Sequence, residues 1–169
     1  ARRPATFGLV AADDAGYEAM ETFLVPAELP RDRKVFRAND PAVPEQVDLV
    51  LYQDGLLGPK GTYRFHADEP SRTASEIVGE NWDLALALAA QYPSFRATVA
   101  ERIIHAAALE NALFAVTTAL PDVIPSLTEL PWAFGEFVSD TAFITVNQLR
   151  MGFQLAAAYG REVGFFHQK

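Results

Sequence analysis

The sequence predicts an α+β protein in which a small N-terminal α/β unit is followed by a mostly α-helical hairpin or bundle. Before Pro93, short segments alternate between the patterns of strands and helices, with turn residues between them. After Pro93, residues 95–120 and 135–160 form two long apolar segments that a proline-rich bend joins. We therefore expect residues 1–70 to form the α/β unit and residues 71–169 to form a helical domain that continues past the end of this sequence.

Four strands and two helices are expected before Pro93. The clearest strand is residues 47–53 (VDLVLYQ), bounded by Pro44 and by the turn pair Asp54-Gly55. The other expected strands are residues 6–11, 34–38 and 62–67, and the last alternates aromatic and polar residues as an edge strand does. Helices are expected at residues 15–24 and 74–91. The second is expected to turn one face toward the core, with Ile77, Leu84, Leu88 and Trp82.

Residues 95–120 have the pattern of a long helix. Ser94 is suited to cap its first turn, and Pro121 ends it because proline has no N–H to donate. Apolar residues recur along it at helical spacing, namely Val99, Ile103, Ala106, Leu109, Leu113, Val116 and Leu120. The bend that follows carries Pro121, Pro125 and Pro131, so we expect a stiff, irregular connection there.

Residues 135–160 predict a second long helix that ends at Gly160. Polar residues share one of its faces, and apolar side chains cover most of the remaining circumference. A helix that is apolar over so wide an arc needs cover on two sides, which one partner helix cannot supply. We therefore expect self-association, or binding of a protein partner, through helix 135–160.

The composition excludes several classes of partner. A net charge of −8 argues against nucleic acid, which needs clustered Lys and Arg, and against simple electrostatic attraction to anionic lipid. The chain has no Cys, which leaves no disulfide, thiolate metal site or cysteine nucleophile and fits a reducing cytosol. No apolar run approaches the ~18 residues of a membrane-spanning helix. We expect a cytoplasmic protein that lies at the inner membrane face if segments beyond residue 169 bind the membrane.

The turn after the first expected strand has the position of a phosphate-binding loop but not its residues. Phosphate binding there needs glycines, a Lys and a hydroxyl group, whereas residues 12–18 (ADDAGYE) place Asp13 and Asp14 where phosphate would lie. We expect an Asp that caps an ordinary helix instead. Residues 58–62 (GPKGT) have suitable residue types but precede a strand. The enzymatic alternative is an acidic site of Asp13, Asp14 and Asp54 that holds Mg²⁺.

The histidines do not match a known catalytic or metal-binding pattern. Glu101 and His105 are four residues apart, which indicates a surface ion pair rather than the Glu-x-x-His motif of helical metal sites. His66 and His167 have no evident triad partner, and the sequence has no G-x-S-x-G nucleophile motif. We therefore predict no catalytic, cofactor-binding or metal-binding residues, and no cofactor.

Four polar residues inside the apolar helices are the candidate site residues: Glu110, Asn111, Asn147 and Arg150. We expect Glu110 and Asn111 to make polar contacts across the hairpin with Asn147 or Arg150. Glu110 is expected to be substantially buried, because exposure of its turn would also expose Leu109 and Leu113.

Four short motifs carry a resemblance to a known family: residues 119–125 (ALPDVIP), 140–142 (DTA), 147–151 (NQLRM) and 156–161 (AAAYGR). Over about residues 96–161, the chain resembles a bacterial helical domain of unknown function that is often fused behind small GTPase domains and occurs in YcjF-type membrane proteins. The resemblance implies a GTPase-associated and membrane-associated module that continues into further apolar helices. It implies no catalytic residues, and the N-terminal unit lacks the motifs that a GTPase would need.

Three functions are open on this sequence. The first is a non-catalytic regulatory or scaffold module, membrane-associated in a longer protein, whose apolar helices bind a partner or a second copy. The second is a degenerate GTPase-like or Mg²⁺-dependent nucleotide-binding domain. The third is binding of a small apolar ligand between the helices. The lack of a catalytic constellation favours the first and argues against an enzyme.

Overall fold

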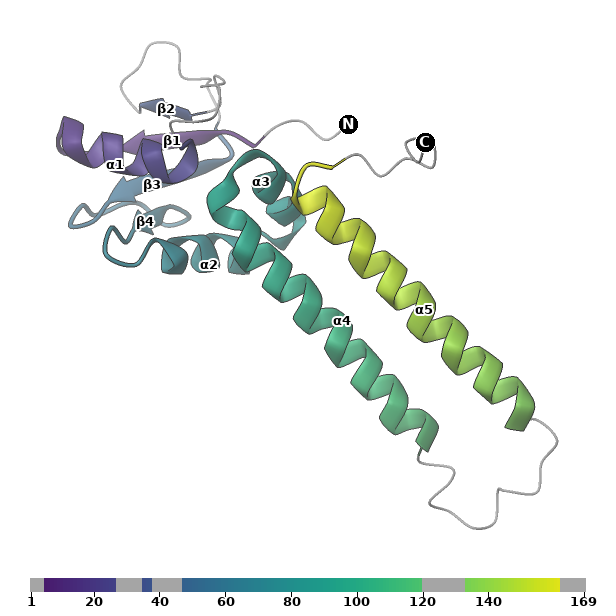
Figure 1. Ribbon diagram of the computed structural model, residues 1–169. Coiled ribbons are helices and arrows are strands. Elements are labelled where there is room, and N and C mark those ends of the chain that lie inside the picture. The colour runs from purple at the N-terminus through teal and green to yellow at the C-terminus, as the bar shows by residue number, and fades with distance from the viewer. Residues whose placement is uncertain (1–4, 27–34, 38–46, 120–132, 162–169) are drawn as a thin grey trace, which may run out of the picture. The chain divides into compact units, whose positions relative to one another are not determined.

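The computed structural model describes residues 5–26, 35–37, 47–119 and 133–161, without the side chains of Ala119 and residues 133–140. It contains two compact units, the first comprising Ala1–Val99 with Ala157–Glu162 and the second Ala100–Ala156 with Val163–Lys169. The predicted α+β class is confirmed, since a small parallel sheet with helices is followed by a helical part (Figure 1). The sequence placed the domain boundary at residue 70, whereas the first unit extends to Val99.

The sheet of the first unit has four parallel strands in the order β2-β1-β3-β4 (Figure 1). They are β1 (Phe7–Val10), β2 (Val35–Arg37), β3 (Leu49–Gln53) and β4 (Tyr63–Phe65). Each lies within a segment that was predicted as a strand, and β4 is an edge strand as expected. The register places Leu9 beside both Arg37 and Leu51, so the carboxyl ends of β1, β2 and β3 lie at one edge of the sheet.

One face of the sheet carries the core of the first unit. Alternate strand residues are buried on it, namely Phe7, Leu9, Leu49, Leu51 and Phe65. Aromatic rings from the helical segments pack there. The Phe7 ring meets the Tyr92 ring edge-on, with centroids 5.1 Å apart, and lies 6.0 Å from the Phe95 ring. Phe23 of helix α1 (Asp14–Leu24) contacts both Phe65 and Phe95.

Residues 74–91 were predicted as one helix but form α2 (Pro70–Glu80), a 3₁₀ turn (Trp82–Leu84) and α3 (Ala85–Gln91). The helix ends at Asn81, whose φ of −126° and ψ of 54° are not helical. Its backbone N–H and its side-chain Nδ2 both donate to the Ile77 carbonyl, at 3.0 and 2.9 Å, and so close the last turn of α2. Ile77 and Leu88 are buried as predicted, whereas Trp82 is exposed. Helix α2 contacts β4, which brings it into the first unit rather than the helical domain.

The second unit holds most of an antiparallel helix pair, α4 (Arg96–Ala119) and α5 (Ala133–Ala158), shown side by side in Figure 1. Phe114 and Phe143 stack between them with ring centroids 4.0 Å apart. Both helices agree with the predicted segments, and α5 ends just before Gly160, whose φ of +66° is left-handed. The predicted proline-rich bend lies outside the described residues. No helix of the described ranges is long and apolar enough to span a bilayer.

Candidate functional site

The carboxyl ends of β1 and β3 are the place where a parallel sheet of this kind usually binds its ligand. The strand order reverses between these two strands, and ligands bind in the crevice outside such a reversal. Asp13 lies there as the N-terminal cap of α1, as the sequence predicted. Its Oδ1 accepts a hydrogen bond of 2.7 Å from the backbone N–H of Gly16.

Gln53, the last residue of β3, fills this crevice with its side-chain amide. Its Oε1 accepts a hydrogen bond of 2.7 Å from the backbone N–H of Ala12, and its Nε2 lies 3.5 Å from Oδ1 of Asp13. Gly16 makes room for the amide, because a Cβ atom at that position would overlap the Gln53 side chain. The Ala12 and Gly16 N–H groups, which a phosphate at the start of α1 would need, are therefore already satisfied.

The sequence analysis missed Gln53. Its partner Ala12 lies 41 residues earlier in the chain, so no local pattern links the two. The one available signal was that the predicted strand at residues 47–53 ends on a polar side chain, whose amide can both donate and accept.

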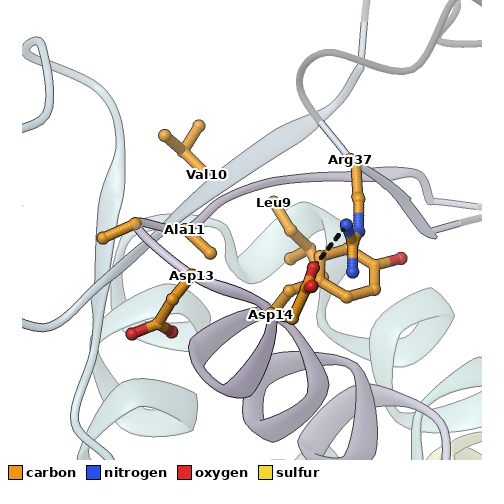
Figure 2. Close-up of a pocket in the computed structure, with 8 residues that line it drawn as sticks. Leu9, Val10, Ala11, Asp13, Asp14 and Arg37 are labelled. Carbon is orange, nitrogen blue, oxygen red and sulfur yellow. Dashed lines mark ion pairs between the residues drawn. The ribbon is translucent and has the colours of Figure 1, made fainter.

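A cavity of about 590 Å³ lies beside this crevice, lined by Leu9, Val10, Ala11, Ala12, Asp13, Asp14, Tyr17 and Arg37. Figure 2 shows Asp14 directed toward Arg37, whose Nη1 lies 2.8 Å from the Asp14 Oδ1 atom. The Arg37 guanidinium also lies 3.9 Å from the centre of the Tyr17 ring. The hydrogen bond that Arg37 donates to the Asp14 carboxylate raises the pKa of Arg37 above its usual value. The charges of Asp14 and Arg37 therefore neutralise each other in the cavity wall, where Arg37 lies over the Tyr17 ring.

The structure does not bring the three acids of the predicted Mg²⁺ site together. Asp13 caps α1, Asp14 pairs with Arg37, and Asp54 accepts from its neighbour Gly55 and lies 3.9 Å from Arg64. Within the described ranges, no group of three or more His, Cys, Asp or Glu side chains is placed to hold a metal ion.

The remaining sequence candidates lie in ordinary structural roles. Glu101 and His105 are exposed on α4. His66 pairs with Glu76 at 3.3 Å, a contact that the sequence analysis did not predict. The segment 58–62 forms a turn before β4, in which the Thr62 hydroxyl donates to the Pro59 carbonyl at 2.7 Å. His167 lies outside the described residues.

Asn147 joins α5 to α4 through a buried polar contact. It is 6% exposed, and its Nδ2 donates hydrogen bonds of 2.8 Å to Asn111 Oδ1 and 3.2 Å to the Ala107 carbonyl. The two protons of one amide group are therefore both used, and the structure brings Asn111 and Asn147 together as a pair.

Glu110 and Arg150 also meet across the hairpin, but at its surface. The Arg150 Nη1 and Glu110 Oε2 atoms are 3.6 Å apart, and the two side chains are 63% and 45% exposed. The prediction that Glu110 is substantially buried is therefore wrong. It assumed that Leu109 and Leu113 must be covered, whereas both are exposed and Ala107 faces inward instead.

Six large apolar side chains form an exposed surface on the hairpin, here called the apolar face: Leu109, Leu113 and Val116 of α4 with Val146, Leu149 and Phe153 of α5. Their exposed fractions run from 47% to 64%. Within each helix they are spaced three and four residues apart, so each set forms one stripe. That spacing is typical of helices that pack against other helices.

The Glu110–Arg150 ion pair places part of each stripe on the same side of the hairpin. Leu113 follows Glu110 by three residues, and Phe153 follows Arg150 by three. Residues three apart share a helix face, so each stripe adjoins its own member of the ion pair. Because carboxylate and guanidinium meet between the helices, Leu113, Val146 and Phe153 lie on the side of the hairpin that carries the ion pair. Leu109, Val116 and Leu149 lie about 100° or more around their helices from the ion pair, so the stripes continue from this side over the outer edges of the hairpin.

Ile104 and Ile144 are also exposed but lie on the other side of the hairpin. With about 100° between successive helical residues, Asn111 separates Ile104 from Glu110 around α4, and Asn147 separates Ile144 from Arg150 around α5. These two residues therefore serve as internal controls for the apolar face.

Comparisons with protein-family models, with curated proteins and with solved structures find no match to this chain. Function is therefore argued from two features of the structure: the sheet crevice that the Gln53 amide fills, and the apolar face of the hairpin.

Proposed function

We propose that the chain is a non-catalytic regulatory or scaffold module that binds another protein through its helical hairpin. The observation that supports this proposal is the apolar face, with six large side chains that are each about half exposed along α4 and α5. An apolar patch of several hundred Å² on a soluble protein marks an interaction site. The three-and-four spacing favours a helical partner over an irregular one.

The sheet supports the non-catalytic part of the proposal. A phosphate entering the crevice would have to displace the Gln53 amide from Ala12 and would meet the Asp13 carboxylate. The neighbouring cavity presents Asp14 to any anion, and its Arg37 is already engaged. These contacts favour a scaffold over a degenerate GTPase or a Mg²⁺-dependent nucleotide-binding domain.

The resemblance to the bacterial helical domain adds a cellular setting to the proposal. On that basis the module works in the cytoplasm beside a GTPase domain, at the inner face of the membrane where the longer protein has segments that bind it. The net charge of −8 favours protein over nucleic acid as its partner.

Site-specific photocrosslinking in the cells that make the protein tests this function. A photoreactive phenylalanine analogue replaces Leu113 in one strain and Ile104, on the opposite side of the hairpin, in another. We expect a discrete crosslinked protein product from position 113 and none from position 104. If positions 113, 149 and 153 all give no product, the proposed function is wrong.

A further inference from the structure

We propose that the apolar face binds a second copy of the same chain, face to face about a twofold axis, with the Glu110–Arg150 ion pairs at the centre of the contact. This inference rests on the proposed function, because it names the partner of the same face. Three properties of the face favour a second copy over another occupant, namely its area, its charge pattern and its helical spacing.

The area of the face approaches one side of a stable dimer. Half-exposed side chains of this size present on the order of 100 Å² each, so the six together present about 600 Å². A standard interface buries roughly 800 Å² on each partner. The remaining area is available from the exposed Glu110 and Arg150 side chains and from the small exposed neighbours Ala106 and Ala142.

The charge pattern of the face is complementary to itself. Its centre carries one acid and one base, which lie 3.6 Å apart and are still 45% and 63% exposed in the single hairpin. An unrelated partner would need a matching pair of opposite charges at the same place. A second copy has that pair by symmetry, because a twofold axis between the helices sets each Glu110 near the partner's Arg150.

The helical spacing fits a hairpin better than a lipid surface or a small ligand. Each stripe follows the three-and-four repeat whose side chains insert between those of a facing helix. Two hairpins packed through this face form a four-helix arrangement with the apolar face inside. The contact then encloses the ion pairs between the two copies. Such enclosed pairs fix the register of the copies and add little to their affinity.

Analytical ultracentrifugation of the 169-residue chain tests the contact. We expect a dimer, and we expect Leu113→Glu or Phe153→Glu to raise its dissociation constant at least about 100-fold, because each buries an unpaired carboxylate at the interface. Ile104→Glu is the matched control and should leave the dissociation constant within about threefold of the parent. Circular dichroism must show equal helix content in all three, since all three side chains are exposed.

Charge exchange tests whether the ion pairs cross between copies. Glu110→Arg gives a face with two cations, and Arg150→Glu gives a face with two anions, so each variant alone should dissociate. Mixed together, the two variants should form a heterodimer with near-parental affinity if the faces meet. If mixing rescues nothing while the Glu110→Arg, Arg150→Glu double variant dimerises normally, the pairs act only within one chain and the proposed geometry is wrong.

The outcomes separate this inference from the proposed function. A parent chain that stays monomeric up to several hundred micromolar overturns the second copy as occupant. If position 113 then crosslinks to a different protein, the scaffold function stands with another partner. If the monomer instead binds phosphatidylcholine vesicles, and Leu113→Glu abolishes this binding, the occupant is a lipid surface and both proposals are wrong.

Discussion

Asn147 on α5 donates a hydrogen bond of 2.8 Å to the side-chain oxygen of Asn111 on α4. The amide pair lies within an otherwise apolar contact, beside the stacked rings of Phe114 and Phe143. A polar pair in such a place fixes which residues of two helices lie opposite each other, because every sliding movement breaks its hydrogen bonds. The register of the hairpin therefore depends on this contact.

Asn147→Ala should destabilise the helical hairpin. The substitution removes the donor to the Asn111 side-chain oxygen and the additional donor to the Ala107 carbonyl, which costs about 1–3 kcal/mol of unfolding free energy. Urea denaturation followed by circular dichroism measures this loss. Gln148→Ala, at the exposed neighbouring position, is the control and should change stability by less than about 0.5 kcal/mol. Equal stability of the two variants would contradict the role of Asn147.

Tyr92→Phe should weaken the sheet unit and reduce its sensitivity to alkali. The buried Tyr92 hydroxyl donates to the Ala5 carbonyl at 2.7 Å, and loss of this donor costs about 1–2 kcal/mol. Burial raises the pKa of Tyr92 far above its usual value, so the folded state holds the phenol proton more tightly than the unfolded state does. The associated stability is complete below about pH 10 and falls as the pH rises above it.

Denaturation of both proteins at neutral and alkaline pH checks this prediction. Stability of the parent should fall more steeply above about pH 10 than that of Tyr92→Phe. Tyr159→Phe changes an exposed phenol and should follow the parent. Parallel pH profiles for the parent and Tyr92→Phe would mean that Tyr92 does not control the alkaline transition.

Gly16→Ala should displace the Gln53 amide from the crevice of the sheet. The added methyl group overlaps that amide, and such overpacking typically costs about 1–3 kcal/mol. Gly55→Ala would be a poor control, because Gly55 has a positive φ of 86°. The better comparison is the double variant Gly16→Ala, Gln53→Ala, in which the methyl group has space and much of the lost stability should return. An equally unstable double variant would mean that the cost has another origin.

Neither GTP nor ATP should bind this chain, with or without Mg²⁺. The Ala12 and Gly16 N–H groups are hydrogen-bonded to Gln53 and Asp13, and two carboxylates lie beside them. Isothermal titration calorimetry should therefore detect no binding at micromolar concentrations. Micromolar affinity that disappears in the Asp13→Ala, Asp14→Ala double variant would overturn the prediction.

Glu110→Ala should have little effect on the stability of the single hairpin. Exposed ion pairs contribute about 0–1 kcal/mol, and this pair is open to water on both members. Thermal melts at nanomolar concentration, where any dimer has dissociated, should agree between variant and parent within the error of the method. A loss of several degrees under those conditions would indicate that Glu110 is enclosed within one chain.

Much of the fold could be predicted from local patterns. The strands at residues 47–53 and 62–67 follow from alternation and from flanking turn residues, and the ends of α4 and α5 follow from Pro121 and Gly160. The break at Asn81 could not be predicted, because no local pattern shows that the Asn81 side chain bonds the Ile77 carbonyl and not solvent.

The candidate sites depended on contacts that no local pattern specifies. Both long helices are apolar around most of their circumference, so periodicity alone did not decide which face of α4 meets α5. The choice of Ala107 over Leu109 as the inward residue follows from the small side chain that lets Asn147 reach the backbone. Gln53 accepts a hydrogen bond from Ala12, which lies 41 residues earlier in the chain. Only the parallel pairing of β1 and β3 brings the two residues close.

The hydrogen bond between Tyr92 and Ala5 has a consequence for biosynthesis. It joins residues 87 positions apart, and the Phe7 ring packs on the same tyrosine. At about 5–20 residues per second, the ribosome needs roughly 4–17 s to make the segment between them. During that interval the nascent β1 lacks the aromatic side chains that enclose it. A fragment that stops at residue 70 should therefore remain unfolded and prone to aggregate, whereas one that reaches Val99 contains every described ring of that cluster.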